Sequence, residues 1–127
     1  MYLSEKEIEA VLMLPGPKRF DYFVKKVADF EKVWGLFDKG WAMAGDDDGR
    51  EVLLLWPAKQ YAQLSAVEDW ASFQPMEIPL VEFLNEWIPQ MVKRKERIGI
   101  FLTPDGKGVI SEPSELNTSL ANELKKF

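Results

Sequence analysis

The sequence predicts a single α+β domain, with a mixed, mainly antiparallel sheet of about five or six strands and flanking helices. The 127 residues fit one domain, and a content of 46% hydrophobic and 13% aromatic residues suffices for a packed core. The stretch 33–56 has the pattern of three consecutive antiparallel strands. Stretches with helical periodicity lie on both sides of it in the sequence.

Two turns divide the stretch 33–56 into strands. Asp38–Gly40 separates the first two apolar runs, and Asp46–Gly49 ends in the Asp-Gly pair that suits a tight hairpin turn. Residues 52–56 are apolar at consecutive positions, which is typical of a strand covered on both faces. We therefore expect this strand at the centre of the sheet, ended by Pro57 because proline cannot donate a ladder hydrogen bond.

Helices are predicted before and after this stretch. Ser4 and Glu7 form a capping box, which predicts a helix over 4–14 at the periphery of a domain that spans 1–127. Residues 17–30 carry an apolar stripe at helical spacing. Further helices are predicted over 57–65, over 80–91 and after Pro113, and Pro89 predicts a kink or an end of the second of these near Trp87.

Three shorter strands complete the predicted sheet. Residues 76–78 are expected at an edge, because Pro75 and Pro79 flank them. Residues 98–102 and 109–110 are expected to pair across a turn over 104–108.

Composition and charge exclude several function classes. The chain has no cysteine and no histidine, which removes disulfides, thiol catalysis, thiolate zinc sites and the commonest acid/base group. The net charge of −5 disfavours binding to nucleic acid or to an anionic membrane. No leader and no long apolar run is present, so we expect a cytoplasmic protein, and we expect no cofactor.

Two groups of carboxylates are candidates for chemistry. Asp46, Asp47 and Asp48 could form a weak divalent-cation site, but adjacent aspartates point in different directions and Arg50 competes for them, which favours a solvated hairpin turn. Glu82 and Glu86 lie four residues apart on a predicted helix, with Glu77 nearby in sequence. They could act as an acid/base pair if burial separated their pKa values, or they could form an acidic surface.

Two basic segments are candidate anion sites. The segment 105–108 could form a backbone anion nest beside Lys107, or a plain β-turn. The segment 93–97 could meet RNA or an acidic partner, but it lacks interleaved aromatic residues, which favours a solvated connector.

The five tryptophans are numerous for a chain of this length, and most are expected in the core. Trp70 is the least periodic of them, so we expect it to be exposed and, beside Phe73, to anchor an interface. A homodimer is a further possibility: if one sheet face lacked a helix, Trp34 or Trp41 would be buried between subunits.

Several short motifs suggest a family. They are Val33-Trp34-Gly35-Leu36, Asp38 with Gly40-Trp41-Ala42, Leu55-Trp56-Pro57 with Tyr61-Ala62, Ile78-Pro79-Leu80 with Phe83-Leu84, and Thr103-Pro104-Asp105-Gly106-Lys107-Gly108. With them the chain resembles, from Phe20 onward, the bacterial family called domain of unknown function twenty-seven fifty. That resemblance implies no catalytic residues. A looser architectural likeness is to the enhanced-serine-sensitivity/secretion-apparatus B type domain, whose members are discussed as interaction modules.

These observations favour a non-catalytic module that binds an unidentified protein partner. The expected surface comprises Trp70, Phe73, Asp46, Asp47 and Asp48. One alternative is an immunity or inhibitor protein for a basic toxin, since complementary charge accelerates encounter. Another is a small-molecule-binding protein or a carboxylate-based enzyme, which would need a concave pocket with converging acidic groups.

Overall fold

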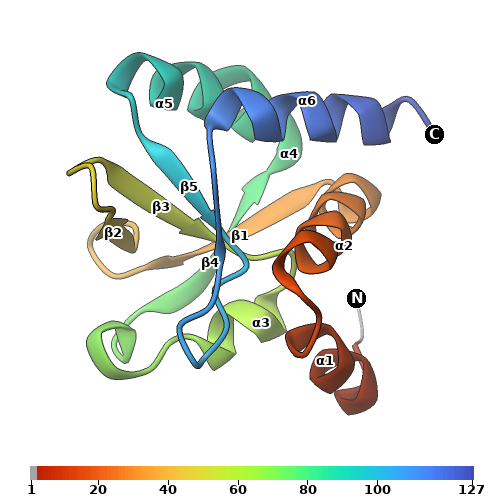
Figure 1. The fold of residues 1–127 in the computed structure, drawn as a ribbon, viewed down its shortest axis with the longest axis vertical. Helices are drawn as coiled ribbons and strands as arrows, with labels where there is room; N and C mark the ends of the chain where they lie inside the picture. Colours follow the sequence, from red (N-terminus) through yellow and green to blue (C-terminus); the bar gives the residue numbers. More distant parts are fainter. Residues whose placement is uncertain (1–2) are drawn as a thin grey trace.

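Two small β-sheets lie between layers of helices in the computed structural model, which describes residues 3–127 (Figure 1). One sheet has the order β1-β4, and the other has the order β2-β3-β5-β6. Only β3 and β5 pair in parallel, so the predicted α+β class with mainly antiparallel pairing is confirmed. The strands are β1 (Lys32–Phe37), β2 (Met43–Gly45), β3 (Glu51–Leu55), β4 (Gln74–Pro79), β5 (Arg97–Ile100) and β6 (Val109–Ser111).

The number of strands matches the prediction, but they form two sheets rather than one. The sheets meet where Trp34 of β1 and Trp56, just after β3, exchange backbone hydrogen bonds of 2.9 and 2.7 Å. At the next residue, a side chain on Gly35 would clash, because its Cβ would lie 2.9 Å from the ring of Trp41. The absent side chain lets Trp41 pack against the β1 backbone at this crossing.

The first predicted hairpin forms only in part. Phe37 and Trp41 make a single bridge, after which β1 and β2 diverge, and β1 takes the distant β4 as its ladder partner. The second hairpin is confirmed: β2 pairs with β3 around the Asp46–Gly49 turn, where Gly49 has the positive φ of 77° that glycine accepts without strain. The predicted central position of β3 between β2 and β5 is also confirmed.

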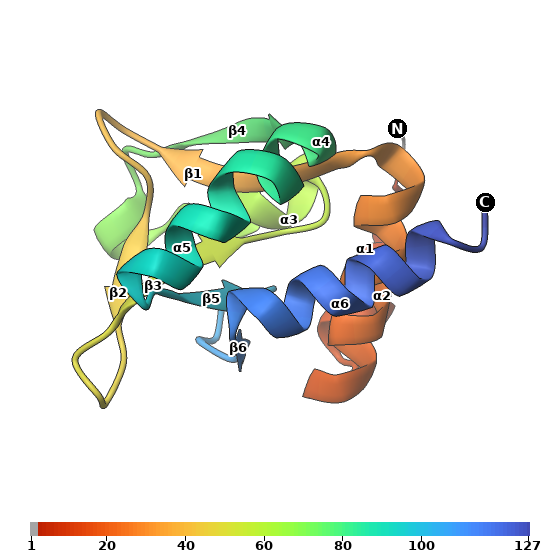
Figure 2. The ribbon, with the colours of Figure 1, turned by 90° about the horizontal axis from the view of Figure 1, so that it is seen from above.

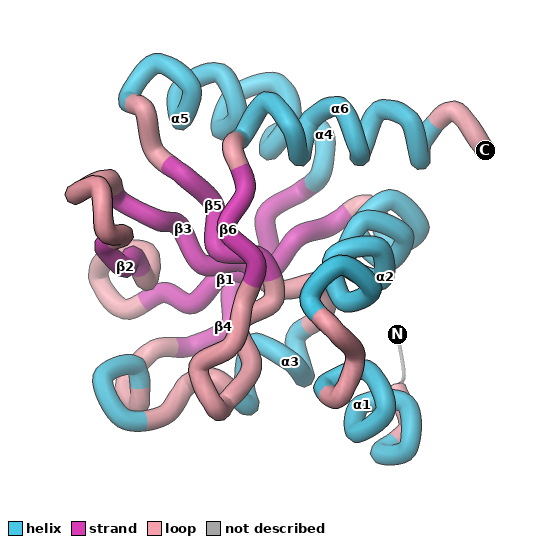
Figure 3. Tube along the Cα trace, in the orientation of Figure 1, coloured by secondary structure: helices cyan, strands magenta, loops and turns pink. Residues whose placement is uncertain are grey.

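Helices cover both faces of the sheets. Helices α5 and α6 lie on one side, and α3 lies on the other (Figures 1 and 2). The tube view shows the strands at the centre with helices around them (Figure 3). The helices are α1 (Glu5–Leu12), α2 (Gly16–Phe30), α3 (Lys59–Leu64), α4 (Leu80–Glu82), α5 (Ile88–Arg94) and α6 (Pro113–Leu124).

The predicted helix ends are explained by local chemistry. The Ser4 hydroxyl accepts a hydrogen bond of 3.1 Å from the backbone N–H of Glu7, which caps α1 as expected. Between α4 and α5, residues 83–87 form a π-helical turn, in which Ile88 N–H donates to the carbonyl of Phe83, five residues back. Pro89 explains this turn, since proline lacks an N–H and its ring clashes with the carbonyl four residues back in a regular helix.

The core lies between the sheets and the helices. Leu53, Leu54, Leu55 and Trp56 are consecutive and buried, as expected of a strand covered on both faces. Fully burying one such large apolar side chain contributes about 1.5–3 kcal/mol. The largest fully buried side chains are Trp56, Tyr61, Phe23, Phe83 and Phe101.

Candidate functional site

The carboxyl ends of the parallel strands β3 and β5 bring together two segments that the sequence analysis singled out. Ligands of α/β sheets commonly bind at such ends. Phe101 follows β5 with φ of 59°, which is uncommon for a bulky residue. It is held there because its N–H donates to the carbonyl of Leu55 at 2.9 Å and its ring packs 4.7 Å from that of Tyr61.

The carbonyl of Leu102 fixes the loop that follows. It accepts hydrogen bonds from Nε1 of Trp56 at 2.8 Å and from Oγ of Ser65 at 3.0 Å. Both donors are buried, so the two bonds satisfy polar atoms that would otherwise be costly inside the core. The loop is thereby fastened to β3 on one side and to the end of α3 on the other.

The segment 103–107 is a turn closed by its own hydrogen bonds. The backbone N–H of Thr103 donates to the carbonyl of Lys107 at 2.6 Å, and Lys107 N–H donates to the Thr103 hydroxyl at 3.1 Å. Gly106 N–H donates to the Thr103 carbonyl at 2.9 Å. The Thr103 hydroxyl also bonds Asp105, which holds the pKa of that carboxyl below its usual range. The Gly106 and Lys107 amides already donate hydrogen bonds within the turn. The segment 105–108 therefore fits the plain β-turn rather than the anion nest.

A cavity of about 120 Å³ lies between this turn and the segment that follows α3. We call it the Trp70 pocket; its lining residues are Ser65, Val67, Glu68, Asp69, Trp70, Leu102, Thr103, Pro104 and Gly106. Trp70 is half-buried and forms one wall, rather than standing free as expected. Small-molecule sites usually exceed roughly 300 Å³, so the pocket matches a single side chain better than a cofactor.

The rim of the Trp70 pocket is acidic. Glu68 and Asp69 are exposed, and neither makes an ion pair with any residue of the described range 3–127. Glu68 has a positive backbone φ of 53°, which residues other than glycine seldom adopt. Phe73 does not line the pocket; it is half-buried one turn further on, where its N–H donates to the Trp70 carbonyl at 3.0 Å.

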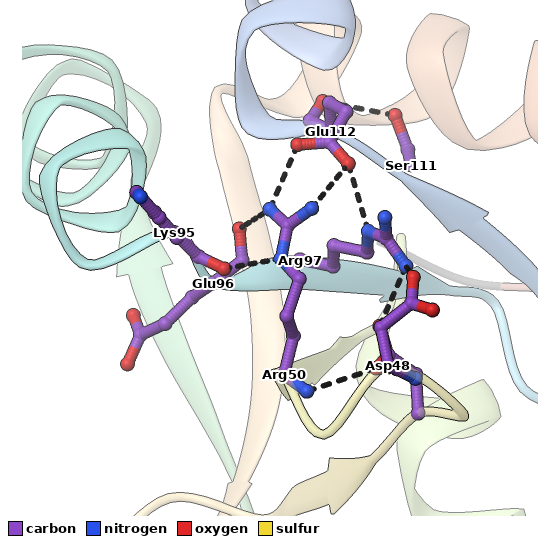
Figure 4. Close-up of polar contacts among 8 residues, drawn as sticks. Asp48, Arg50, Lys95, Glu96, Arg97, Ser111 and Glu112 are labelled. Atoms are coloured by element: carbon purple, nitrogen blue, oxygen red, sulfur yellow. Dashed lines mark hydrogen bonds and ion pairs between the residues drawn. The ribbon is translucent and has the colours of Figure 1, made fainter.

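Arg97, the last residue of the basic connector, pairs with the acidic hairpin (Figure 4). One guanidinium nitrogen of Arg97 lies 2.8 Å from a carboxylate oxygen of Asp46 and 2.9 Å from one of Asp48. A second nitrogen lies 2.8 Å from Glu112. The other carboxylate oxygen of Asp46 accepts the backbone N–H groups of Asp48 and Arg50, each at 2.9 Å. Asp46, which was predicted to belong to a binding surface, therefore stabilises the hairpin turn instead.

Arg50 extends this cluster to a third segment. Its two terminal nitrogens reach the two carboxylate oxygens of Glu112 at 3.0 and 2.9 Å, a bidentate arrangement (Figure 4). Hydrogen bonds from Arg50 and Arg97 hold the pKa of Glu112 below its usual range, and the backbone N–H of Arg50 contributes most to the lowered pKa of Asp46. Asp47 is exposed at the tip of the turn and joins no ion pair among residues 3–127.

The remaining candidate carboxylates do not converge. Glu77 pairs with Lys32 on β1 at 2.9 Å, away from the helix that carries Glu82 and Glu86. Glu82 accepts a hydrogen bond of 2.9 Å from Nε1 of Trp87, and both helical glutamates are exposed. Within residues 3–127, no group of three or more metal-ligating side chains is arranged to hold a metal ion. None of the helices described in that range is long and apolar enough to cross a membrane.

Comparison with known families agrees with the motifs. The family model described as Protein of unknown function (DUF2750) matches residues 20–120. The chain belongs to this family. No curated protein and no solved structure gives a significant match. The DUF2750 match includes every strand and the whole Trp70 pocket, whereas α1 lies outside it.

Two residues of this DUF2750 chain that hold the candidate sites together, Ser65 and Glu112, could not be predicted from the sequence. Ser65 was not a candidate, because a lone serine after a short helix carries no pattern. Glu112 was not a candidate either, although it accepts hydrogen bonds from both Arg50 and Arg97. Its position two residues after the strand expected over 109–110 was the one available signal, since strand ends at one edge of a sheet bring side chains together.

Proposed function

We propose that this protein is a non-catalytic protein-binding module whose Trp70 pocket receives one basic side chain of a partner protein. The observation that carries the proposal is a half-buried indole wall beside two rim carboxylates, Glu68 and Asp69, that form no ion pair within the described residues 3–127. An indole face attracts a cation through its quadrupole, and a nearby carboxylate adds direct charge attraction. A lysine or arginine side chain satisfies both.

The wider surface supports the same role. Phe73 adds half-buried aromatic area near Trp70, and half-buried aromatic residues are common interface anchors. Asp47 and the net charge of −5 would attract a basic partner before contact, whereas Asp46 and Asp48 act through the ion-pair cluster that holds the hairpin. The proposal places this binding in the bacterial cytoplasm.

The experiment begins with capture of partners from lysate of the host by the tagged protein, followed by calorimetric titration of each purified partner. The test variants are Trp70→Ala and the double variant Glu68→Gln, Asp69→Asn. The double variant Glu5→Gln, Glu9→Gln removes the same charge from the exposed face of α1 and serves as the control.

We expect each test variant to weaken binding by about tenfold or more, and the control to bind as the wild type does. Thermal unfolding of each variant confirms that it is folded. Equal affinity of wild type and a folded Trp70→Ala variant for every partner would show that the Trp70 pocket is not the binding site.

A further inference from the structure

We propose a second binding surface on the opposite side of the sheets, which takes an extended segment of a protein chain with a basic and an acidic residue about five positions apart. This surface, the tryptophan groove, is formed by Trp41 and the helix that runs through α4 and α5. Figures 1 and 2 show this helix on the other side of the strands from α3. The groove therefore does not depend on the Trp70 pocket.

The tryptophan groove is a hollow of about 560 Å³ that two indoles line together with charged and polar side chains. The rings of Trp41 and Trp87 meet edge-to-face with centroids 5.1 Å apart, and Phe37 also packs edge-to-face against Trp41, with centroids 5.1 Å apart. Both tryptophans are half-buried. The lining residues are Trp41, Glu82, Glu86, Trp87, Gln90, Met91 and Arg94.

The π-helical turn shapes one end of the groove. In a regular α-helix, residues five apart lie about 140° apart around the axis, which separates their side chains. The π-turn over residues 83–87 takes one more residue per turn and brings Glu82 and Trp87 onto the same face. The resulting hydrogen bond of 2.9 Å holds the Glu82 carboxylate at the edge of the Trp87 indole. A cation over the face of this indole is attracted by the ring, and the nearby carboxylate adds charge attraction.

Charge along the groove is polarised. Glu82, Glu86, Gln90 and Arg94 follow one another at four-residue intervals, with the acidic residues at one end and the arginine at the other. Arg94 donates to Gln90 at 3.0 Å, and none of the three charged side chains forms an ion pair with another residue of the range 3–127.

The length of the charge pattern sets the spacing of the complementary charges in the ligand. The midpoint of the two glutamates lies about 15 Å along the helix from Arg94, at about 1.5 Å per residue. An extended chain covers that distance with about five residues at about 3.3 Å each. The complementary segment thus carries lysine or arginine at one end and aspartate or glutamate about five residues away.

A solvated helix surface would carry the same order of charges, because acidic residues near the start and basic residues near the end suit the helix dipole. Such a surface does not require two half-buried indoles beside the charges. A hollow of about 560 Å³ lies within the range of ligand pockets, and it combines two indoles with a few charged side chains, as such pockets do.

Selection from a phage library of random dodecapeptides tests the proposal. The full chain is the target, alongside Trp87→Phe, Trp87→Ala and the double variant Glu82→Lys, Glu86→Lys. Trp70→Ala serves as the control. Near-UV circular dichroism and thermal unfolding confirm that each variant is folded, and Trp87→Phe keeps an aromatic ring if Trp87→Ala fails to fold.

We expect the wild type to enrich peptides with opposite charges four to six positions apart. Synthetic versions of these peptides should bind Trp87→Ala at least about tenfold more weakly and bind Trp70→Ala unchanged. The Glu82→Lys, Glu86→Lys variant should lose the preference for the basic residue. No enrichment of this charge pattern, or equal binding by wild type and the folded Trp87 variants, would overturn the proposal. Loss of binding in Trp70→Ala would instead assign the peptides to the Trp70 pocket.

Discussion

Arg97 connects three segments that are far apart in the sequence. Its guanidinium pairs with Asp46 and Asp48 in the β2–β3 turn and with Glu112 before α6, while the residue itself begins β5. Single exposed ion pairs contribute little to stability, but a network of several pairs around a planar guanidinium holds its members in one geometry. Here that geometry fixes the turn relative to the two strands at the far edge of the sheet.

The ion-pair cluster predicts a pH-dependent effect of Arg97→Gln. The lowered pKa values of Asp46 and Glu112 mean that their contribution to stability is complete above the unfolded values near about 4 and is lost as the pH falls through the folded values. Arg97→Gln should therefore lower the free energy of unfolding more at about pH 7 than at about pH 3. Urea unfolding at both pH values measures this.

Lys107→Gln is the matched control for that experiment. Lys107 lies 3.8 Å from Asp105 in a pair that is mostly exposed to solvent, so its removal should change little at either pH. If Arg97→Gln destabilised the protein equally at both pH values, lost packing of the side chain rather than lost charge pairing would be its cause.

Gly99 is a second position at which one residue determines packing. It is buried in β5, where an added Cβ would lie 2.8 Å from Cδ2 of Leu54 and 3.1 Å from Cγ1 of Val52. Both neighbours are buried and cannot move freely, so Gly99→Ala should destabilise the protein by about 1–3 kcal/mol. Gly45→Ala, with no atom within 4 Å of its Cβ, should stay within about 0.5 kcal/mol of wild type in the same chemical unfolding assay. Equal effects would contradict this account.

At the scale of elements, the helix through α4 and α5 shows how a local defect positions functional groups. Pro89 makes the regular helical hydrogen bond impossible, and the chain responds with the π-helical turn over 83–87 that aligns Trp87 with Glu82. Sequence reasoning located this defect, because the missing N–H is a property of one residue. It could not choose between a kink, an end and a π-turn, because that choice depends on packing against the sheet.

Pro89→Ala should reverse this arrangement. Restoring the N–H permits the regular bond to the carbonyl of Asn85, so we expect the protein to gain about 1 kcal/mol of stability. Trp87 should then rotate away from Glu82 and change the near-UV circular dichroism spectrum. Pro17→Ala, in the first turn of α2 where proline is tolerated, should alter neither the spectrum nor the stability appreciably. An unchanged spectrum in Pro89→Ala would mean that packing alone sustains the π-turn.

The edge strand β4 is protected against pairing with other chains. In β1, Trp34 directs its backbone groups to Trp56, and the Leu36 carbonyl accepts from Ala42, so neither bonds to β4. Their partners in the register, Glu77 and Pro75, therefore direct their backbone outward. Pro79 lies two residues beyond Glu77, so its backbone is also directed outward. Neither proline has an N–H that could donate a hydrogen bond to another strand. Figure 2 shows β4 at the outer edge of the molecule.

Replacing these prolines should promote self-association. The double variant Pro75→Thr, Pro79→Ser adds two outward N–H groups, and a free edge that can donate recruits further strands. Light scattering during size-exclusion chromatography, over a range of concentrations, should show larger species than for wild type. Met76 lies on the same strand, but its backbone groups face β1 rather than the free edge. The variant Met76→Thr should therefore behave as the wild type does. Indistinguishable elution of the double variant would contradict the proposed role of the prolines.

At the scale of the whole molecule, predictions from local patterns and the pairing of distant segments separate clearly. The Asp46–Gly49 turn, the central position of β3 and the edge position of β4 followed from residues close together in the sequence. The pairing of β1 with β4 and the division into two sheets could not be predicted in this way. Pairing between distant strands depends on how the whole chain packs, which no local pattern records. The Trp70 pocket likewise required the turn at 103–107 to meet the segment after α3.

The joint between the sheets leads to a prediction about unfolding. Trp56 exchanges backbone hydrogen bonds with Trp34 of the smaller sheet, while its indole donates to Leu102 beyond the larger sheet. Since this fully buried residue directly follows β3 of the larger sheet and bonds to β1 of the smaller one, we expect the two sheets to unfold in one cooperative transition. Urea curves from far-UV circular dichroism and from tryptophan fluorescence should coincide.

Trp56→Phe tests whether this joint is the cause of the cooperativity. It removes the hydrogen bond to Leu102 and leaves that carbonyl with only Ser65 as a side-chain donor, which should cost about 1–3 kcal/mol. Because the backbone bonds to Trp34 persist, both probes should shift together to a lower urea concentration. Trp87→Phe, which removes an exposed hydrogen bond instead, should shift the midpoint little. Separation of the two curves in wild type would show that the sheets unfold independently and that Trp56 does not couple them.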